Sequence, residues 1–344
     1  MRDLEYCAKQ TVDVCSGLKP EERVVVIHDE AAIEIADSVV YRARKISHGN
    51  VFPYMMERFG LRPDDGSTPL QFPRSIGHAL GKADLSFYIA GQTKKNERES
   101  FRVPMLKIVN NNQRLRHVHM PGITMEAFLA GMSSDYDIIR RVTRRVNSRV
   151  KDAEVIRVTT PLGTDFTAIV RKYRWEIADG FASPEKWINL PDGETFTSPE
   201  SAYGRIVVDG SLGDHFDQKY GLLHETPLNL IVDQGRVISV RCDGNDELQR
   251  EFSEYIRIDE NANRIGEFAI GTNIGIDGLI GNMIHDEKFP GVHVAVGDPL
   301  SEFTGAEWES KVHCDMTMRL CNIYVDGEQI MENGKFSEVY LPRK

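Results

Sequence analysis

Residues 155–170 read VIRVTTPLGTDFTAIV, in which two β-branched runs flank a turn that contains Pro161 and Gly163. Runs rich in valine, isoleucine and threonine are typical of strands, and a Pro/Gly segment between them predicts a hairpin. Short apolar runs separated by Asp-Gly pairs continue from here to the C-terminus. We therefore expect a β-rich α+β domain over residues 151–344.

The residues before this hairpin alternate strand and helix signals. The apolar run VVVI at 24–27 is long enough for a buried parallel strand. Apolar residues then recur at helical spacing, at Ile33, Ala36, Val40 and Ala43. Further strand-like runs lie at 51–52, 85–90 and 106–109. Strands that alternate with helices predict βαβ units, so we expect an α/β domain with a mostly parallel sheet over residues 1–150.

Composition excludes several classes of protein. The chain has 344 residues, enough for two cores, and its 42 basic and 52 acidic residues give a net charge of −10. An acidic chain argues against a nucleic-acid binder, and no apolar run approaches the roughly 20 residues of a membrane helix. The N-terminus lacks the apolar core of a signal peptide, and the five cysteines are scattered without a C-x-x-C pair. We expect a soluble, cytoplasmic protein with reduced thiols.

The segment 124–150 has a helical pattern, with valines every four residues and several arginines off that stripe. These arginines are Arg140, Arg141, Arg144, Arg145 and Arg149. They form either an anion-binding face or a solvated face, and the solvated face is the default for an amphipathic helix.

The strongest chemical signal is His313-Cys314-Asp315 in an apolar, strand-like stretch. Alternate residues of a strand project to the same side, so His313 and Asp315 are expected to point together. An imidazole and a carboxylate arranged in this way can both coordinate one divalent metal ion. From this pair alone, an exposed His and Asp on a polar strand face is the favoured interpretation.

Three further residues change that balance in favour of a metal site. Glu267 and His293 lie within apolar runs, and Glu194 follows the turn at 191–193. Carboxylates in apolar surroundings are costly unless a cation compensates them, and none of these positions has an obvious Lys or Arg neighbour. A metal ion would compensate several of them together. His117 and His119 have the same i, i+2 spacing but no nearby acid, so we do not expect a metal there.

Most of the chain from residue 120 onward resembles the aminopeptidase T family of metallo-aminopeptidases. The fit is best with its shorter branch, which includes enzymes of the 5-nitroanthranilate aminohydrolase and 2,5-dihydroxypyridine dioxygenase types. The resemblance rests on NLPDGETFTSPE (189–200), IGEFAIGTN (265–273), HDEKFPGVHVAVGD (285–298) and VHCDMTMRLCNIYVDGEQIMENGKF (312–336). Looser likeness extends to residues 120–128 and 161–165.

The resemblance implies a metal site and a set of ligands. Carried over motif by motif, the metal ligands are Glu194, Glu267, His293, His313 and Asp315. In the peptidases this set resembles a two-metal site, which implies one or two divalent ions (Mn, Zn or Co). One departure is that no tyrosine follows the H-x-A-x-G segment, where the sequence reads Asp298-Pro299-Leu300-Ser301. This departure argues against peptide cleavage.

The family offers three activities for such a site. A carboxylate-rich site suits hydrolysis, so the preferred hypothesis is a metal-dependent hydrolase that deaminates a small activated aromatic amine, with Glu194 or Glu267 as general base. The alternatives are a metallo-aminopeptidase and a ring-cleaving dioxygenase with Fe(II). In the dioxygenase type a histidine replaces Glu267. The resemblance also suggests a homodimer or larger homo-oligomer. Candidate aromatic residues around the substrate are Tyr173, Trp187 and Tyr220.

Overall fold

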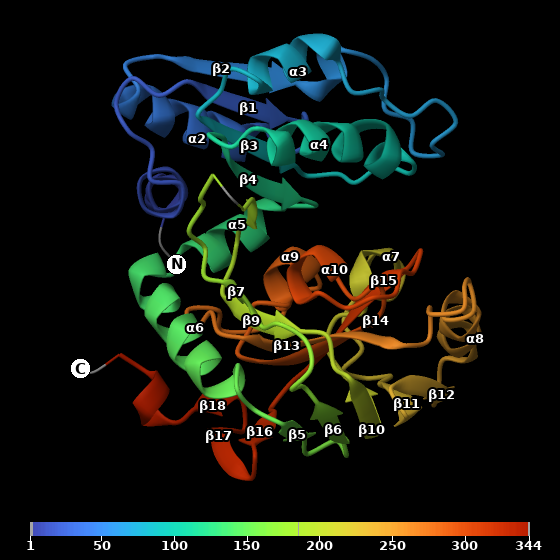
Figure 1. Cartoon of the computed structure of the whole chain (residues 1–344). Helices are drawn as coiled ribbons and strands as arrows, with labels where there is room; N and C mark the ends of the chain where they lie inside the picture. The colour runs from blue at the N-terminus through green and yellow to red at the C-terminus, as the bar shows by residue number, and fades with distance from the viewer. Residues whose placement is uncertain (1–2, 185, 343–344) are drawn as a thin grey trace. The chain divides into compact units, whose positions relative to one another are not determined.

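The computed structural model describes residues 3–184 and 186–342, and its chain divides into two compact units (Figure 1). The first unit comprises Met1–Asp137 and Gly180–Asp192, and the second comprises Ile138–Asp179 and Gly193–Lys344. This division differs from a single boundary near residue 150. The difference arises because the chain returns to the first unit, where β8 (Ile188–Asn189) pairs with β4 (Arg116–Pro121).

The first unit contains a parallel sheet of five strands in the order β2-β1-β3-β4-β8. Its other strands are β1 (Val24–His28), β2 (Val51–Met55) and β3 (Leu85–Ala90). The α-helices are α1 (Leu4–Lys9), α2 (Ile33–Ile46), α3 (Arg74–Leu80), α4 (Val103–Asn111) and α5 (Met125–Met132). Shorter helical segments are η1 (Gln10–Cys15), η2 (Met56–Arg58) and η3 (Arg98–Arg102). This arrangement confirms the predicted α/β fold with a parallel sheet.

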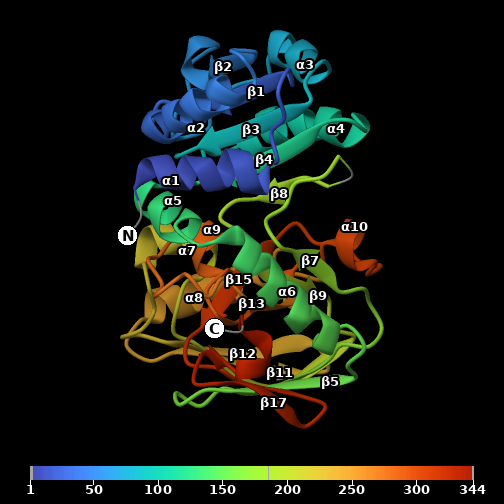
Figure 2. The same cartoon turned by 90° about the vertical axis from the view of Figure 1, so that its left-hand side faces the viewer.

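Helices cover both faces of this sheet (Figure 2). Val25 and Ile27 of β1 and Tyr88 of β3 belong to the apolar core that includes residues of α3 and α4. The alternate residues Val24 and Val26 point to the opposite face, which α2 covers, and they are fully buried. Burial on both faces explains why β1 is continuously apolar in sequence.

The expected strand at 106–109 is wrong, because these residues lie in α4. Pro104 lies in the first helical turn, where its missing N–H leaves no hydrogen bond unmade. Met105 and Val109 are four residues apart and both buried, which is the spacing of one helix face. A run of four apolar residues does not by itself distinguish a buried strand from a helix.

The second unit contains two sheets of mainly antiparallel strands. The larger has the order β12-β11-β10-β6-β5-β16-β17-β18, and the smaller has the order β15-β14-β13-β9-β7. The strands of the larger sheet are β5 (Val155–Thr159), β6 (Asp165–Ile169), β10 (Ser201–Val208), β11 (Leu228–Asp233), β12 (Arg236–Cys242), β16 (Asn322–Val325), β17 (Glu328–Glu332) and β18 (Lys335–Phe336). Those of the smaller sheet are β7 (Glu176–Ala178), β9 (Glu194–Thr197), β13 (Ile265–Gly271), β14 (Gly291–Gly297) and β15 (His313–Met318). The predicted β-rich half and its 155–170 hairpin are confirmed.

Helices complete the second unit. They are α6 (Tyr136–Val150), which begins at the end of the first unit, α7 (Gly213–Tyr220), α8 (Asp246–Tyr255), α9 (Met283–Asp286), α10 (Ser301–Thr304) and η4 (Glu338–Tyr340). One apolar core joins the two sheets with α6: it includes Val158 of the larger sheet, Phe268 and Val294 of the smaller sheet, and Val142 of α6. Among the described residues, no helix is long and apolar enough to cross a membrane.

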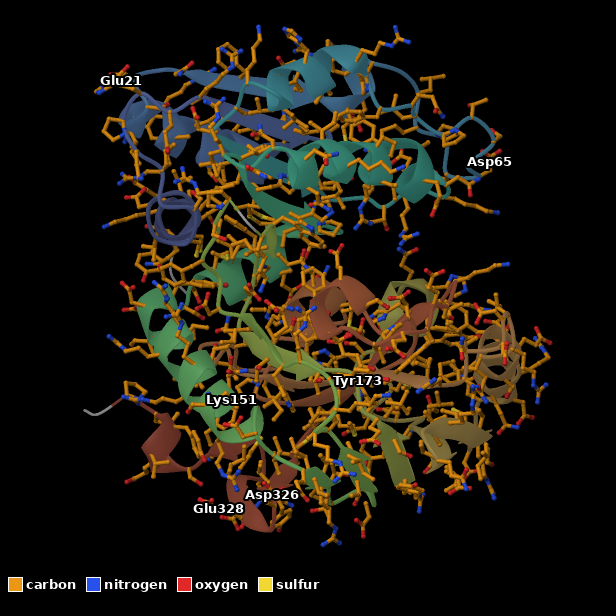
Figure 3. All side chains as sticks on the ribbon, in the orientation of Figure 1. Glu21, Asp65, Lys151, Tyr173, Asp326 and Glu328 are labelled. Atoms are coloured by element: carbon orange, nitrogen blue, oxygen red, sulfur yellow. The ribbon has the colours of Figure 1, made fainter. Side chains whose placement is uncertain are left out.

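The arginines of α6 make contacts within the second unit. Arg144 donates to Asp179 at 2.8 Å, and Arg149 lies 3.2 Å from Glu328 and 3.7 Å from Asp326, both labelled in Figure 3. These ion pairs are partly exposed and hold the helix against its surroundings. This arrangement agrees with a solvated face rather than an anion-binding face.

Candidate metal centre

The smaller sheet of the second unit has one apolar face and one polar face. Val292, Val294 and Val296 of β14 point into the core, and His293 and Ala295 point to the other side. Figure 1 shows α9 over this second face, away from the larger sheet. All five metal ligands that the sequence predicts lie on four neighbouring strands of this sheet, β15, β14, β13 and β9.

Strand register brings the carboxylates of Glu267 and Asp315 together on either side of a small residue, Ala295. Ala295 of β14 lies between Glu267 of β13 and Asp315 of β15, and both pairings are antiparallel. A shift in register between Ile265 and Glu267 marks a bulge at Gly266, a device that re-aims a side chain. Ala295 has a small side chain and leaves room above the sheet. The carboxylates of Glu267 and Asp315 therefore face a common space, and His293, two residues before Ala295 on the same face of β14, faces it too.

The predicted pair on β15 has the expected geometry. His313 and Asp315 project from the same face, and His313 Nε2 lies 3.3 Å from Asp315 Oδ1 and 3.2 Å from Glu267 Oε2. His293 Nε2 lies 3.7 Å from Glu267 Oε1 and 3.5 Å from Glu194 Oε2. Glu267 therefore lies between the two imidazoles and connects the two halves of the cluster.

The backbone orients His313. Its Nδ1 is 2.9 Å from the carbonyl oxygen of Asp298, which can only accept a hydrogen bond. Nδ1 therefore carries the proton, and Nε2 faces the carboxylates as the nitrogen available to a metal ion. Gly297, which is paired with His313, has φ +102°, and a Cβ there would lie 2.1 Å from the oxygen of Val312. Only glycine permits this close approach of the two strands.

Two residues in this site were missed by the sequence analysis. Glu287 follows α9 and joins His293 and Asp315 in a third group whose ligand atoms lie within 4.8 Å of one another. Lys288 is 1% exposed, and its Nζ contacts Glu287 Oε1 at 2.7 Å and Glu194 Oε1 at 2.5 Å. Both residues lie within the quoted motif at 285–298, but they are in a loop without strand periodicity that would have marked them.

Asp286 holds this loop in place. Its carboxylate accepts hydrogen bonds from the backbone N–H groups of Ile280 at 2.9 Å and Gly281 at 2.8 Å. His285 Nδ1 contacts the same carboxylate at 2.7 Å, and the hydroxyl of Ser211 also donates to it. A buried carboxylate with so many donors is fixed in position, and it fixes the residues that follow it, Glu287 and Lys288.

Mutual contacts shift the pKa values of the buried groups. Burial is the largest influence on Glu194, outweighs the nearby Lys288, and raises the pKa of Glu194 to about 7. Burial also acts to raise the pKa of Glu267, but hydrogen bonds to His293 and His313 outweigh it and lower that pKa to about 2. Burial acts to lower the pKa of His293, but Glu267 and Glu194 outweigh it and raise this pKa to about 9. Protons and a divalent ion therefore compete for the same donor atoms.

The donor set fits a divalent metal ion. Three overlapping groups have ligand atoms within 4.8 Å of one another, and each combines one imidazole with two carboxylates. The groups are Glu194, Glu267 and His293; Glu267, His313 and Asp315; and Glu287, His293 and Asp315. Glu194 Oε2 is buried and has no hydrogen-bond partner within the described part of the chain. A metal ion would give this atom a partner and balance the excess of carboxylates.

The structure places the other residues from the sequence analysis elsewhere. His117 and His119 lie on β4 of the first unit, hydrogen-bonded to each other, and belong to none of the three groups. Trp187 packs edge-on against His119, with ring centroids 5.5 Å apart. Tyr173 packs against Trp308, and the Tyr220 hydroxyl donates to Glu251 at 2.8 Å. These tyrosines make ordinary packing and surface contacts.

Comparisons with known proteins identify a family and a shared fold. A family model described as thermophilic metalloprotease (M29) matches residues 137–336, more than half of the chain. A 2,5-dihydroxypyridine 5,6-dioxygenase from Pseudomonas putida KT2440 is 26% identical over 217 residues. That match covers 60% of this chain and 60% of the relative, so the chain aligns with less than two thirds of the relative's length.

Two solved structures share the fold over nearly the whole chain. The 2,5-dihydroxypyridine dioxygenase of Pseudomonas putida KT2440 has a TM-score of 0.70 at 18% identity, covering 97% of this chain and 96% of that one. Wild-type AmpT from Thermus thermophilus has a TM-score of 0.69 at 18% identity, covering 97% and 98%. At this identity the likeness establishes the common fold.

Proposed function

Because the chain belongs to the M29 (aminopeptidase T) family of metal-dependent enzymes, we propose that it is a hydrolase that acts on the C–N bond of a small activated aromatic amine. The observation that supports hydrolysis is the ligand composition: each of the three groups contains one imidazole and two carboxylates. Non-haem Fe(II) oxygenases typically use two imidazoles and one carboxylate. Carboxylate-rich sites suit Mn, Zn or Co and hydrolytic chemistry.

In this proposal Glu267, His293, His313 and Asp315 hold one or two divalent ions. A divalent ion bound there acts as a Lewis acid and lowers the pKa of coordinated water toward neutrality. His313 is oriented for this role by the Asp298 carbonyl, and Glu267 lies between the two imidazoles. The residues thus define the place where water and substrate meet.

Glu194 is the best-placed group for proton transfer. Lys288 anchors its Oε1, and its Oε2, 3.5 Å from His293 Nε2, has no hydrogen-bond partner among the described residues. Glu194 would accept a proton from the attacking water and deliver it to the departing nitrogen, the general base and acid of a hydrolysis. Lys288 keeps the carboxylate pointed at the reacting atoms throughout.

An aromatic amine is favoured over a peptide by two features. The segment after β14 reads DPLS at 298–301 and lacks the tyrosine expected from the resemblance to the peptidases. The curated relative is named for action on a dihydroxypyridine, a small ring. A nitro group para to the amine would accept the negative charge that builds on the ring as water adds to the amine-bearing carbon.

The test measures products from two substrates with metal-loaded protein. We expect ammonia from 2-amino-5-nitrobenzoate under anaerobic conditions, and little or no release from leucine p-nitroanilide. Efficient cleavage of leucine p-nitroanilide with no ammonia from the arylamine would instead establish an aminopeptidase. Turnover of a hydroxylated ring that requires iron and O₂ would establish a dioxygenase.

The role of Glu194 is tested separately with Glu194→Gln. A proton carrier that does not bind the metal would lose about 10²–10⁴-fold in turnover and keep its metal affinity. Loss of metal together with activity would show that Glu194 is a ligand. Unchanged turnover would exclude both roles.

A further inference from the structure

The first unit holds a second cluster of buried polar side chains, which includes the His117 and His119 pair. Register aligns Tyr88, His119 and Asn189 across the neighbouring strands β3, β4 and β8, and it aligns Ser86 with His117 one step earlier. These residues share one face of the sheet. His117 and His119 are 0% and 1% exposed, and Tyr88 stacks on His119 with ring centroids 4.7 Å apart.

A chain of hydrogen bonds connects this cluster to Arg102. The Arg102 Nε–H can only donate, and it reaches His119 Nε2 at 3.2 Å. His119 therefore carries its proton on Nδ1 and donates to His117 Nε2 at 3.2 Å, and His117 donates from Nδ1 to the Ser86 hydroxyl at 2.8 Å. Both imidazoles are neutral in this arrangement. Burial lowers the pKa of each of them, to about 3 for His117.

The neutral His119 ring therefore holds the Arg102 side chain in place without compensating its positive charge. Within residues 3–184 and 186–342 it makes no ion pair, and the His119 ring is its one hydrogen-bond partner, which leaves both Nη groups free. Arg62 of the same unit is different, because carboxylates compensate its charge: its guanidinium contacts Asp29, Glu57 and Glu97. A half-buried guanidinium held at Nε presents its two Nη donors as a fixed fork, a geometry that matches a carboxylate.

Two further groups beside His119 complete a ligand-binding arrangement. Asn189 lies opposite His119 in the sheet, and its Oδ1 is buried with no hydrogen-bond partner among the described residues. Trp187 lies two residues earlier on the same face, with its ring against His119. Arg102, Trp187 and Asn189 therefore all adjoin His119: Arg102 through its hydrogen bond, Trp187 through the ring contact and Asn189 through strand pairing.

We propose that Arg102, Trp187 and Asn189 form a binding site for an aromatic carboxylate that carries an N–H or O–H donor. The carboxylate pairs with the Arg102 fork, the ring contacts Trp187, and the ligand's donor satisfies Asn189 Oδ1. His119 and His117 are positioning residues, because their fixed tautomers hold Arg102 at Nε. The site lies within the first unit, and it does not depend on the reaction proposed above because binding is measured without turnover.

The experiment measures benzoate and 2-aminobenzoate binding to the full chain by calorimetry, with uncharged benzamide as the comparison ligand. We expect both carboxylates to bind and 2-aminobenzoate to bind more tightly. Arg102→Met should weaken both by at least about tenfold, since a charge-assisted pair is lost, and should leave benzamide unaffected. Arg98→Met is the matched control, because Arg98 is 73% exposed in the same helical segment, where it pairs with Glu99.

Asn189→Leu should remove the advantage of 2-aminobenzoate over benzoate and leave benzoate affinity within about twofold. Circular dichroism and metal affinity establish that each variant is folded. Absence of carboxylate binding, or equal affinity in the wild type and Arg102→Met, would overturn the proposal. A Trp175→Phe/Trp308→Phe background leaves Trp187 as the single tryptophan, so its fluorescence must respond to benzoate if the ring contacts the ligand.

Competition gives a second test of the same site. 2-Amino-5-nitrobenzoate also carries a carboxylate and an N–H donor, so it should displace benzoate, and Arg102→Met should abolish this competition. Benzoate binding that 2-amino-5-nitrobenzoate does not reduce would contradict the proposed site.

Discussion

Each unit of this protein contains a pair of neighbouring histidines, and the two pairs are in opposite chemical states. His117 on β4 is fully buried and its pKa is lowered to about 3, whereas His293 on β14 is 2% exposed and its pKa is raised to about 9. Burial acts to lower both values. The difference comes from the neighbours, which are a hydroxyl and another imidazole around His117 and carboxylates around His293.

This contrast shows that burial of a histidine does not by itself indicate a metal site. The pair in the first unit is satisfied by neutral hydrogen bonds and leaves no donor atom for an ion. The pair in the second unit lies among carboxylates whose charge needs compensation, by protons in the metal-free protein or by a metal ion. The surrounding acids, not the imidazoles, distinguish the two environments.

The largest expected effect is the loss of a metal ligand. His313→Ala should reduce activity below detection and weaken metal binding by at least about 100-fold, because even residues that only orient a ligand contribute 10–100-fold. The metal content of the dialysed protein measures the loss of binding, and a steady-state assay measures the loss of activity. His224→Ala is the control, since His224 is half exposed and forms an ion pair with Glu225 outside the metal centre. Full metal occupancy in His313→Ala would refute the site.

Glu267→Gln should have the next largest effect. The change keeps the size of the side chain and removes the charge that lies between His293 and His313. We expect turnover to fall by about 10²–10⁴-fold with the fold retained, as measured by steady-state kinetics and circular dichroism. A variant that fails to fold would assign Glu267 a structural role instead.

Lys288→Met tests the balance of charge in the metal centre. Without Lys288, Glu194 and Glu287 are left without their cation, and removing one partner of a buried pair costs about 3–5 kcal/mol. The free energy of unfolding should fall by about this amount in the metal-free protein and by less after metal is added. Lys219→Met, at a surface pair with Glu251, should change little. Equal losses with and without metal would contradict compensation by the ion.

The smallest expected effect is on the pH dependence of the free energy of unfolding, which should have opposite signs for the two histidine pairs. The depressed pKa of His117 means that its contribution to stability is complete above pH 6.5 and is lost as the pH falls toward 3. The raised pKa of His293 has the opposite sign: in metal-free protein its contribution is complete below pH 6.5 and is lost as the pH rises through 9.

Urea unfolding of the metal-free protein, followed by the fluorescence of Trp187 as the single tryptophan, measures the free energy of unfolding of the first unit. His117→Asn should remove up to about 1.4 kcal/mol per pH unit from the acid dependence between pH 6 and 4. His293→Asn serves as the comparison and should leave that acid dependence unchanged, because His293 belongs to the other unit. Identical acid slopes in the wild type and His117→Asn would contradict a neutral buried His117.

Much of the metal centre could be predicted from the sequence because strands have a period of two. His313 and Asp315 could be placed on one face from their spacing alone, and Glu267 and His293 were noticeable as polar residues within apolar runs. The resemblance to a known family then gave all five residues a common role. That role as metal ligands stays a prediction, although the structure brings the five together.

Other features depended on contacts between residues distant in sequence. Glu287 and Lys288 lie in a loop, and their importance follows from Asp286, which gathers the loop around its carboxylate. The helix at 103–111 was mistaken for a strand because four apolar residues fit either period. Residues 180–192 return to the first unit through the pairing of β8 with β4, which no local pattern indicates.

The sequence by itself determined the two kinds of architecture, the acidic character and the imidazoles and carboxylates available to a metal ion, because these depend on local periodicity and residue type. Only the tertiary structure decided which residues surround each buried polar group. Packing of η3 against the sheet set His119 beside Arg102, and strand register set His293 among carboxylates. Register is fixed by packing across the whole sheet, and the charge state of a buried group depends on what that packing places within a few ångströms of it.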